Sequence, residues 1–437
     1  MLKFFKNIPL GLTYILPLAL LTGPAISDII IVTISLWFLI SSFYTKDYYW
    51  IKLPIVKIFF FLWFSLILIS FFSYNKFYSF SDSIIFIRFF IFAIAVSCWI
   101  INDIKKAKIL ICIVFASICI LIIDGTFQLL NYSSEQGFGK SIFGFKAFVY
   151  GRMTGPFNDE IIGAFIAKYF FISLFFILLF KNKIIKQITF LIFFILGFTI
   201  VFFSGERMAL ATLLLGSFIL LLNREVRLKI FFNLIFCFLM IFLFSLYHKS
   251  FNDFKILEDK PEHLGRLISK EFKCADDTSK LCNKLIRVQP SFFEVIKHFD
   301  NSVYFAIYNS ATKMWLDNPL TGVGLNNFEF VCENNDKYKL DTKNYGKCSA
   351  HPHNFYLQWL TEGGILVFLL FIVFVIYLII PTVANIKKLP STIAFVSLVT
   401  VLWPFMSSGS LLKNHHGIQV FFVISLCLIL TKYRNEL

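Results

Sequence analysis

The fold of this chain is decided by uncharged apolar stretches such as Gly364-Ile-Leu-Val-Phe-Leu-Leu-Phe-Ile-Val-Phe-Val-Ile-Tyr-Leu-Ile-Ile380. A helix needs about 20 consecutive apolar residues to cross the hydrocarbon core of a bilayer. Lipid offers no hydrogen-bond partners, so a segment that crosses it must satisfy its own backbone, as a helix does. With the residues that precede it, this stretch predicts a membrane-spanning helix over 355–380.

Similar stretches recur along the whole sequence, in which 58% of the residues are hydrophobic and 15% are charged. Soluble domains carry about 25% charged residues. We therefore predict an all-α polytopic membrane protein with about 12 transmembrane helices. They cover approximately residues 8–22, 26–44, 54–73, 81–101, 107–130, 159–180, 187–203, 206–222, 228–247, 355–380, 391–408 and 415–431.

The distribution of charge orients these helices. The net charge is +15, and the excess of Lys and Arg lies in short loops that follow every second predicted helix. Short basic loops stay on the cytoplasmic side of a membrane. Both termini are therefore predicted inside the cell and the long polar segment 248–354 outside it. The excess of basic residues is explained by the orientation of the protein in the membrane, so we do not expect the protein to bind nucleic acid.

The long segment 248–354 divides the chain into three predicted parts. Residues 1–247 form an N-terminal transmembrane region with an external loop over 131–158, and residues 355–437 form a C-terminal transmembrane region. Apolar residues recur at helical spacing over 302–317, before the breaker Asn318-Pro319 and a glycine-rich turn. A loop this long with its own periodicity is not a simple connector, so we expect a small helical cap domain.

Four of the nine cysteines lie in this segment: Cys274, Cys282, Cys332 and Cys348. An even number of cysteines in an external segment indicates disulfides. Proximity in sequence favours Cys274–Cys282 and Cys332–Cys348, although four cysteines allow three connectivities. A zinc site is the alternative, but the sequence has no Cys-x-x-Cys spacing there.

Arginines near the predicted external ends of helices are candidates for binding an anion. Arg207 follows Gly205 in a tight turn and begins the next predicted helix. A helix N-terminus and a guanidinium together suit phosphate or diphosphate, and Arg152 precedes a similar turn. The alternative is pairing with Glu206 or a lipid headgroup. Arg88 lies inside an apolar segment and needs a partner or a polar cavity, whereas Asp159 and Glu160 are expected to complement a helix dipole.

Two histidines precede the helix over 355–380, in the sequence His351-Pro-His-Asn354. Asn354 is a favourable N-cap. A histidine just outside a helix at the bilayer surface suits acid–base chemistry or contact with phosphate. Two histidines can also bind a metal, but no third ligand stands at suitable spacing, so we expect no metal. The pair His415-His416 is expected at the bilayer interface.

These motifs resemble the signatures of the bacterial O-antigen ligase and O-antigen polymerase family over approximately residues 10–430. The resemblance lies in Arg152-x-x-Gly-x-Phe157, Ser204-Gly-Glu-Arg207-Met-Ala, Trp315-x-x-Asn-Pro-Leu-x-Gly-Val-Gly324 and His351-Pro-His-Asn-Phe-Tyr-Leu-Gln-x-x-x-Glu362-Gly-Gly364. It implies an inverting, metal-independent glycosyltransferase of the inner membrane, with the GT-C-like architecture of enzymes that use lipid-linked sugars. The implied donor is a glycan on undecaprenyl pyrophosphate, and the implied acceptor is the lipid A–core or a growing glycan.

The resemblance also implies roles for individual residues at the periplasmic face. Arg207 would hold the diphosphate and His353 would assist attack by the acceptor hydroxyl, so these two are the catalytic candidates. The substrate-binding candidates are Arg152, His351, Asn354, Glu362 and Arg287. Many members carry an arginine in the helix before the Gly-Val-Gly turn, where this chain has Tyr304 and Asn309. Either Arg287, Lys313 or Arg266 replaces it, or this diphosphate contact is missing.

Three other functions remain possible from the sequence. A polymerase would join lipid-linked repeats with the same machinery. A polysaccharide transporter or flippase would carry an internal repeat, interrupted helices and charges near the bilayer midplane, and the sequence shows no such duplication. A structural or sensor protein would bind a partner through the segment 248–354, and would tolerate the loss of Arg207 or His353.

Overall fold

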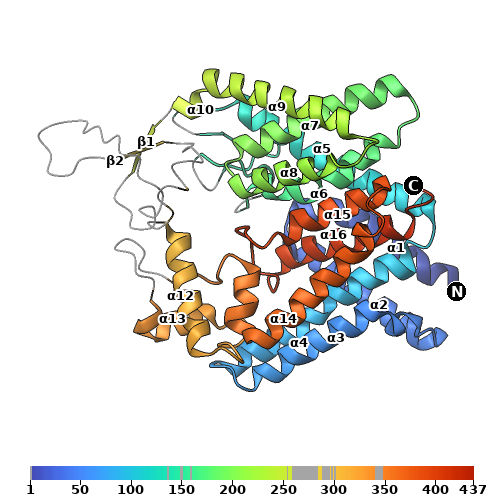
Figure 1. Cartoon of the computed structure of the whole chain (residues 1–437), viewed down its shortest axis with the longest axis vertical. Helices are drawn as coiled ribbons and strands as arrows, with labels where there is room; N and C mark the ends of the chain where they lie inside the picture. The colour runs from blue at the N-terminus through green and yellow to red at the C-terminus, as the bar shows by residue number, and fades with distance from the viewer. Residues whose placement is uncertain are drawn as a thin grey trace, which may run out of the picture.

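The computed structural model describes residues 2–134, 137–147, 151–157, 160–252, 254–257, 284–287, 302–339 and 348–437, with residues 296 and 299. The described chain is almost entirely helical, as predicted, and Figure 1 shows its arrangement. The predicted apolar segments coincide with α1 (Leu2–Ala19), α2 (Pro24–Thr45), α3 (Pro54–Ser70), α4 (Lys76–Ile94), α5 (Ile104–Leu130), α6 (Ile162–Leu178), α7 (Lys183–Phe203), α8 (Arg207–Leu220), α9 (Arg227–Tyr247), α14 (Phe355–Val383), α15 (Leu389–Leu402) and α16 (Asn414–Lys432).

Seven of these helices are long and apolar enough to cross a membrane: α2, α4 with its π-helical continuation η3 (Ala95–Ile100), α5, α7, α9, α14 and α16. Shorter apolar helices, namely α1 with η1 (Leu20–Thr22), α3, α6, α8 and α15, account for the other predicted segments. The chain is thus a multi-pass membrane protein. That the shorter helices also cross the bilayer stays a prediction.

The polar segment between α9 and α14 contains α10 (Lys249–Asn252), β1 (Phe254–Leu257), β2 (Lys284–Arg287), α12 (Val303–Asp317), α13 (Phe328–Asn334) and η6 (Asp336–Tyr338). Ser302 caps α12 by accepting a hydrogen bond from the Phe305 amide, and the helix ends before Asn318, as the sequence predicts. β1 and β2 pair antiparallel, with Phe254 opposite Arg287. The all-α prediction missed this pair because strands of four residues leave too short a pattern to recognise.

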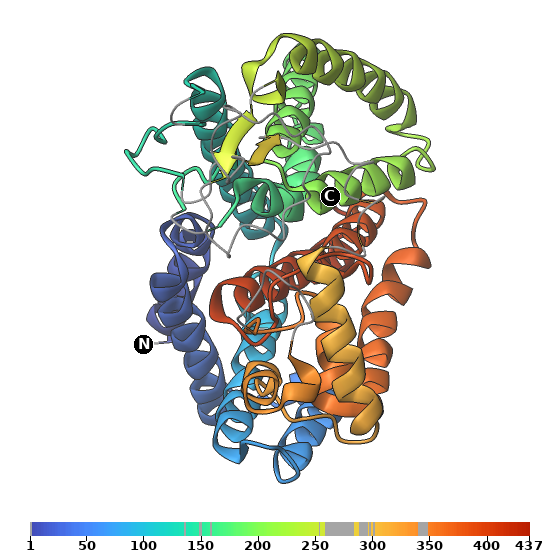
Figure 2. The same ribbon diagram turned by 90° about the vertical axis from the view of Figure 1, so that its left-hand side faces the viewer.

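The helices form two groups that meet at α6. Helices α5 to α9 occupy the upper part of Figure 1, and α1 to α4 with α14 to α16 occupy the lower part. α6 packs against α5, α7 and α8 in one group and against α15 and α16 in the other. Figure 2, seen from the end that carries α12 and the two strands, shows the segment before α16 between the groups. Side chains on α6 can therefore contact side chains on α16, in the other group.

The glycine-rich turn after α12 is docked onto α14 rather than left open. The amides of Val323 and Gly324 donate to the carbonyls of Thr361 and Glu362, at 2.9 and 3.0 Å. Gly324 has φ 100° and Gly364 has φ 69°, a left-handed conformation that L side chains rarely adopt. A Cβ atom on Gly364 would also collide with the Leu320 carbonyl. These glycines therefore allow the polar segment to lock against the start of α14.

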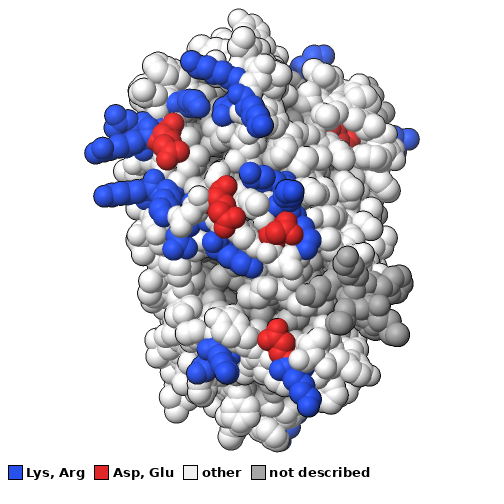
Figure 3. All heavy atoms as spheres, turned by 90° about the vertical axis from the view of Figure 1, so that its right-hand side faces the viewer, with Lys and Arg blue, Asp and Glu red and all other residues white. Residues whose placement is uncertain are grey.

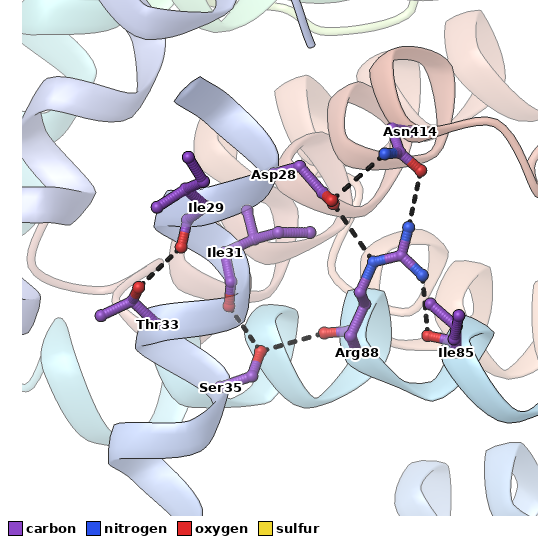
Figure 4. A network of polar contacts seen from close by, with 8 residues as sticks. All are labelled: Asp28, Ile29, Ile31, Thr33, Ser35, Ile85, Arg88 and Asn414. Carbon is purple, nitrogen blue, oxygen red and sulfur yellow. Dashed lines mark hydrogen bonds and ion pairs between the residues drawn. The ribbon is translucent and has the colours of Figure 1, made fainter. Parts of the chain in front are cut away.

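Arg88 ties three helices together, as Figure 4 shows. Its guanidinium donates to Asp28 of α2 at 3.2 Å and to Asn414 of α16 at 2.7 Å. Asn414 in turn donates to Asp28 at 3.1 Å, and a third guanidinium bond reaches the Ile85 carbonyl. These partners satisfy the charge inside the apolar segment, so the structural interpretation of Arg88 holds.

We expect Arg88→Met to destabilise the protein by about 2 kcal/mol, because Asp28 would then lie partly buried without its cation. The apparent Tm of the detergent-solubilised protein measures this loss. Arg227→Met, at the exposed first residue of α9, is the control and should change the Tm little. An equal Tm for Arg88→Met and wild type would show that this cluster does not stabilise the fold.

Candidate functional site

The site is built around the first residues of α14. Asn354 caps this helix as predicted, since its side chain accepts a hydrogen bond from the Leu357 amide at 2.9 Å. Its amide nitrogen donates to the carbonyls of Pro404 and Met406, in the turn that joins α15 to α16. Both ends of the Asn354 amide are thus occupied by the protein. Asn354 is a positioning residue that joins this turn to the two preceding histidines.

His353 has a strained backbone. Its φ of 53° lies in the left-handed region, which is uncommon for residues other than glycine. The Ser408 amide donates to the His353 carbonyl at 2.8 Å and holds this conformation. Such strain persists where surrounding structure enforces it, and it concentrates at functional sites. The ring of His353 lies 4.3 Å from that of His351 and 5.6 Å from that of Tyr304, measured between centroids.

Both histidines are held in the neutral form. Burial lowers the pKa of His353 below its usual 6.5, because an apolar surrounding penalises the charged imidazolium. Burial, with the charges of His353 and Lys413, lowers the pKa of His351 to about 3. A neutral imidazole can accept a proton, so His353 is chemically suited to act as a base near neutral pH.

Arg207 begins α8, as the sequence predicts, after a turn in which Gly205 has φ 81°. The guanidinium of Arg152 donates a hydrogen bond to the Gly205 carbonyl. A Cβ atom on Gly163 of α6 would lie 3.1 Å from the Glu206 Cβ, so this turn packs closely on α6. The structure therefore brings Arg152 to the turn that carries Arg207, next to the start of α6. Two arginines at one place favour an anionic ligand.

A buried lysine, which the sequence reasoning missed, connects the two halves of this site. Lys168 of α6 is 7% exposed and donates to Gln419 at 2.5 Å and to Nδ1 of His416 at 3.2 Å. It interacts electrostatically with Glu206, next to Arg207, while His416 interacts with His351. An ionisable residue inside an apolar stretch is the signal that identifies such a site from sequence. Lys168 stands in the predicted segment 159–180.

His415 and His416 lie at the start of α16, and their depth at the bilayer interface stays a prediction. His415 is 8% exposed, and its Nδ1 lies 2.7 Å from the carboxylate of Glu160. Burial tends to raise the pKa of Glu160, but the hydrogen bond and charge of His415, with the charge of Lys168, hold it below its usual value. These contacts arise because α16 packs against α2, α4 and α6, which no local pattern reveals.

Other candidates lie apart from this cluster. Glu362 is 1% exposed, and its carboxylate accepts hydrogen bonds from Gln358 at 2.8 Å and from the Phe328 amide at 3.3 Å. This places it under the docked turn, where it anchors α13 to α14, so the described contacts give it a structural role. The backbone of Arg287 lies in β2, whereas Arg266 is outside the described residues.

One of the two predicted disulfides is present. Cys332 of α13 is bonded to Cys348, which lies three residues before His351. This bond joins α13 to the segment that carries His351 and His353. Cys274 and Cys282 lie outside the described residues. Within the described ranges, no group of three or more His, Cys, Asp or Glu side chains is arranged to hold a metal ion.

A family model described as O-antigen ligase matches residues 191–372. The match begins in α7 and ends in α14, so it contains Arg207 and the His351–Asn354 segment but not Arg152 or Lys168. No curated protein matches the chain.

Proposed function

The chain belongs to the O-antigen ligase family, whose members are glycosyltransferase-like enzymes acting on lipid-linked glycans, and from this we propose that it is an O-antigen ligase. It transfers polysaccharide from undecaprenyl pyrophosphate to the lipid A–core at the periplasmic face of the inner membrane. The observation that carries the proposal is the neutral, strained His353 at the same end of the helices as Arg152 and Arg207.

The reaction follows from the charges of these groups. His353 takes the proton of an acceptor hydroxyl, and the oxygen attacks the anomeric carbon of the donor sugar. The bond between that carbon and the diphosphate oxygen breaks, so one displacement inverts the configuration. The diphosphate leaves with its negative charge neutralised by Arg207 and Arg152, which are fixed before the reaction begins. No metal is required because the cations come from side chains.

His351, next to His353, is proposed to contact the substrate. Tyr304, which occupies the position of the family's arginine, faces the ring of His353. A cation near His353 would therefore have to come from another residue, and we propose Lys413, whose charge acts on His351.

The proposed orientation rests on surface charge. Lys and Arg side chains gather on the face that Figure 3 presents, which is the end of the molecule where both termini lie in Figure 1. Cytoplasmic loops carry such an excess of basic residues. We propose that twelve helices cross the inner membrane with both termini in the cytoplasm. Residues 248–354 would then form a periplasmic cap domain between the transmembrane regions 1–247 and 355–437.

Fusions of alkaline phosphatase test this orientation. A fusion after Asn335 should be active, because the enzyme folds in the oxidising periplasm. A fusion after Lys387, in the loop between α14 and α15, should be inactive and is the matched control. Activity at Lys387 with none at Asn335 would invert the topology.

Deletion of the gene tests the function. A ligase deletion should leave lipid A–core without polysaccharide, while polymer accumulates on undecaprenyl pyrophosphate. Core that carries a single repeat would instead indicate the polymerase alternative. Undecorated core, together with lipid-linked glycan confined to the cytoplasmic leaflet, would instead indicate a transporter.

A further inference from the structure

Lys168 fixes the protonation state of a neighbouring histidine. Its ammonium group carries three donors and no acceptor. It faces Nδ1 of His416 at 3.2 Å, so Nδ1 must be the accepting nitrogen, and the ring proton is on Nε2. His416 is therefore a neutral hydrogen-bond donor that cannot serve as a base.

The donor group of His416 has no acceptor in the part of the chain that the structure describes. Its Nε2 is buried and makes no hydrogen bond there. Buried donors almost always have a partner, and leaving one without an acceptor is costly. His248 provides the contrast at the same end of the molecule, since its Nε2 lies 3.1 Å from the Leu129 carbonyl and its Nδ1 lies 2.7 Å from Ser250. The Nε2 of His416 is thus set up for an acceptor that the described protein does not supply.

The surroundings of His416 identify the chemistry of that acceptor. On one side it interacts with His351, next to the proposed base. On the other side, Lys168 interacts with Glu206, in the turn that carries Arg207 and receives the hydrogen bond of Arg152. Glu160, which also interacts with Lys168, is paired with His415. Lys168, Arg152 and Arg207 together outnumber Glu160 and Glu206, so an anionic oxygen is the favoured ligand.

We propose that His416, held as a donor by Lys168, binds a phosphoryl oxygen of the lipid diphosphate. The inference rests on the proposed function and adds a contact that the arginines alone do not provide. Lys168 acts as a positioning residue, because it fixes the tautomer of His416. Gln419 has the same kind of role, since its carbonyl oxygen accepts from Lys168 and holds the ammonium in place.

Binding of undecaprenyl pyrophosphate to the purified protein in detergent tests the proposal. His416→Phe should raise the Kd about tenfold or more, the effect expected when a hydrogen bond to a charged group is lost. His416→Gln, whose amide nitrogen can occupy the place of Nε2, should restore most of the affinity. Lys168→Met should weaken binding and remove the single-tautomer signature of His416 in ¹⁵N spectra of the histidine rings.

His248→Phe is the matched control, because it makes the same replacement at a histidine whose nitrogens both have protein partners. It should bind the lipid as wild type does. If His416→Phe also binds as wild type while Arg207→Ala does not, the inference is wrong and the proposed function stands. If wild type itself does not bind the lipid, the proposed function fails. Competition by phosphatidylglycerol at equal concentration would make this a headgroup site and overturn the assignment to the donor.

Discussion

Arg207→Ala should reduce glycan transfer by about 100-fold or more, because a fixed charge that stabilises the leaving diphosphate is lost. The variant should still insert and fold, since Arg207 stands at the first position of α8, outside the packed interior of that helix. Transfer is measured with purified protein, lipid-linked polysaccharide and lipid A–core acceptor. The loss should appear in the rate of transfer and in the affinity for the lipid diphosphate together.

Two further variants make the result for Arg207 specific. Arg207→Lys keeps the charge but loses the paired donors of the guanidinium, so it should retain intermediate activity. Arg224→Ala makes the same replacement at an exposed arginine beyond the other end of α8, and it should transfer glycan normally. Full activity in Arg207→Ala would remove this residue from the catalytic mechanism.

Replacement of His353 should have the second large effect. His353→Asn should slow transfer by about 100-fold or more, the contribution expected of a general base. Asparagine is chosen because it tolerates the left-handed φ of 53° better than alanine does. The backbone and the bond from Ser408 should therefore persist, and the apparent Tm should change little. Near-normal transfer by a folded His353→Asn protein would show that the acceptor hydroxyl needs no help from this residue.

The pH dependence of wild-type transfer provides an independent check on His353. A base must be unprotonated to act, and burial lowers the pKa of His353 below 6.5 by penalising its charged form. The neutral form consequently still predominates at pH 6.5. The rate should reach half of its maximum only below that pH. A half-maximal rate at or above pH 6.5 would contradict a buried, neutral base at this position.

The sequence determined the membrane character of the protein and several of its helix boundaries, because both depend on local pattern. Apolar length specifies a spanning helix wherever lipid leaves the backbone no other partner. Capping and breaking residues act on their immediate neighbours, which is why Ser302, Asn354 and Asn318 marked helix boundaries correctly. The same local logic found Arg207 at a helix start and paired Cys332 with Cys348.

Only the tertiary structure decided which polar groups share a site. Arg88 could not be interpreted from sequence because its partners Asp28 and Asn414 come from distant helices. Lys168 and His416 are 248 positions apart, and they are in contact because α6, in one group of helices, packs against α16 in the other. Glu362, a binding candidate in the motif that follows His351, is a buried anchor because the turn beside Gly364 packs over it. The packing of the helices decides which polar side chains become neighbours. The spacing of apolar residues in the sequence predicts where helices lie, but it does not show which distant residue will contact a buried charge.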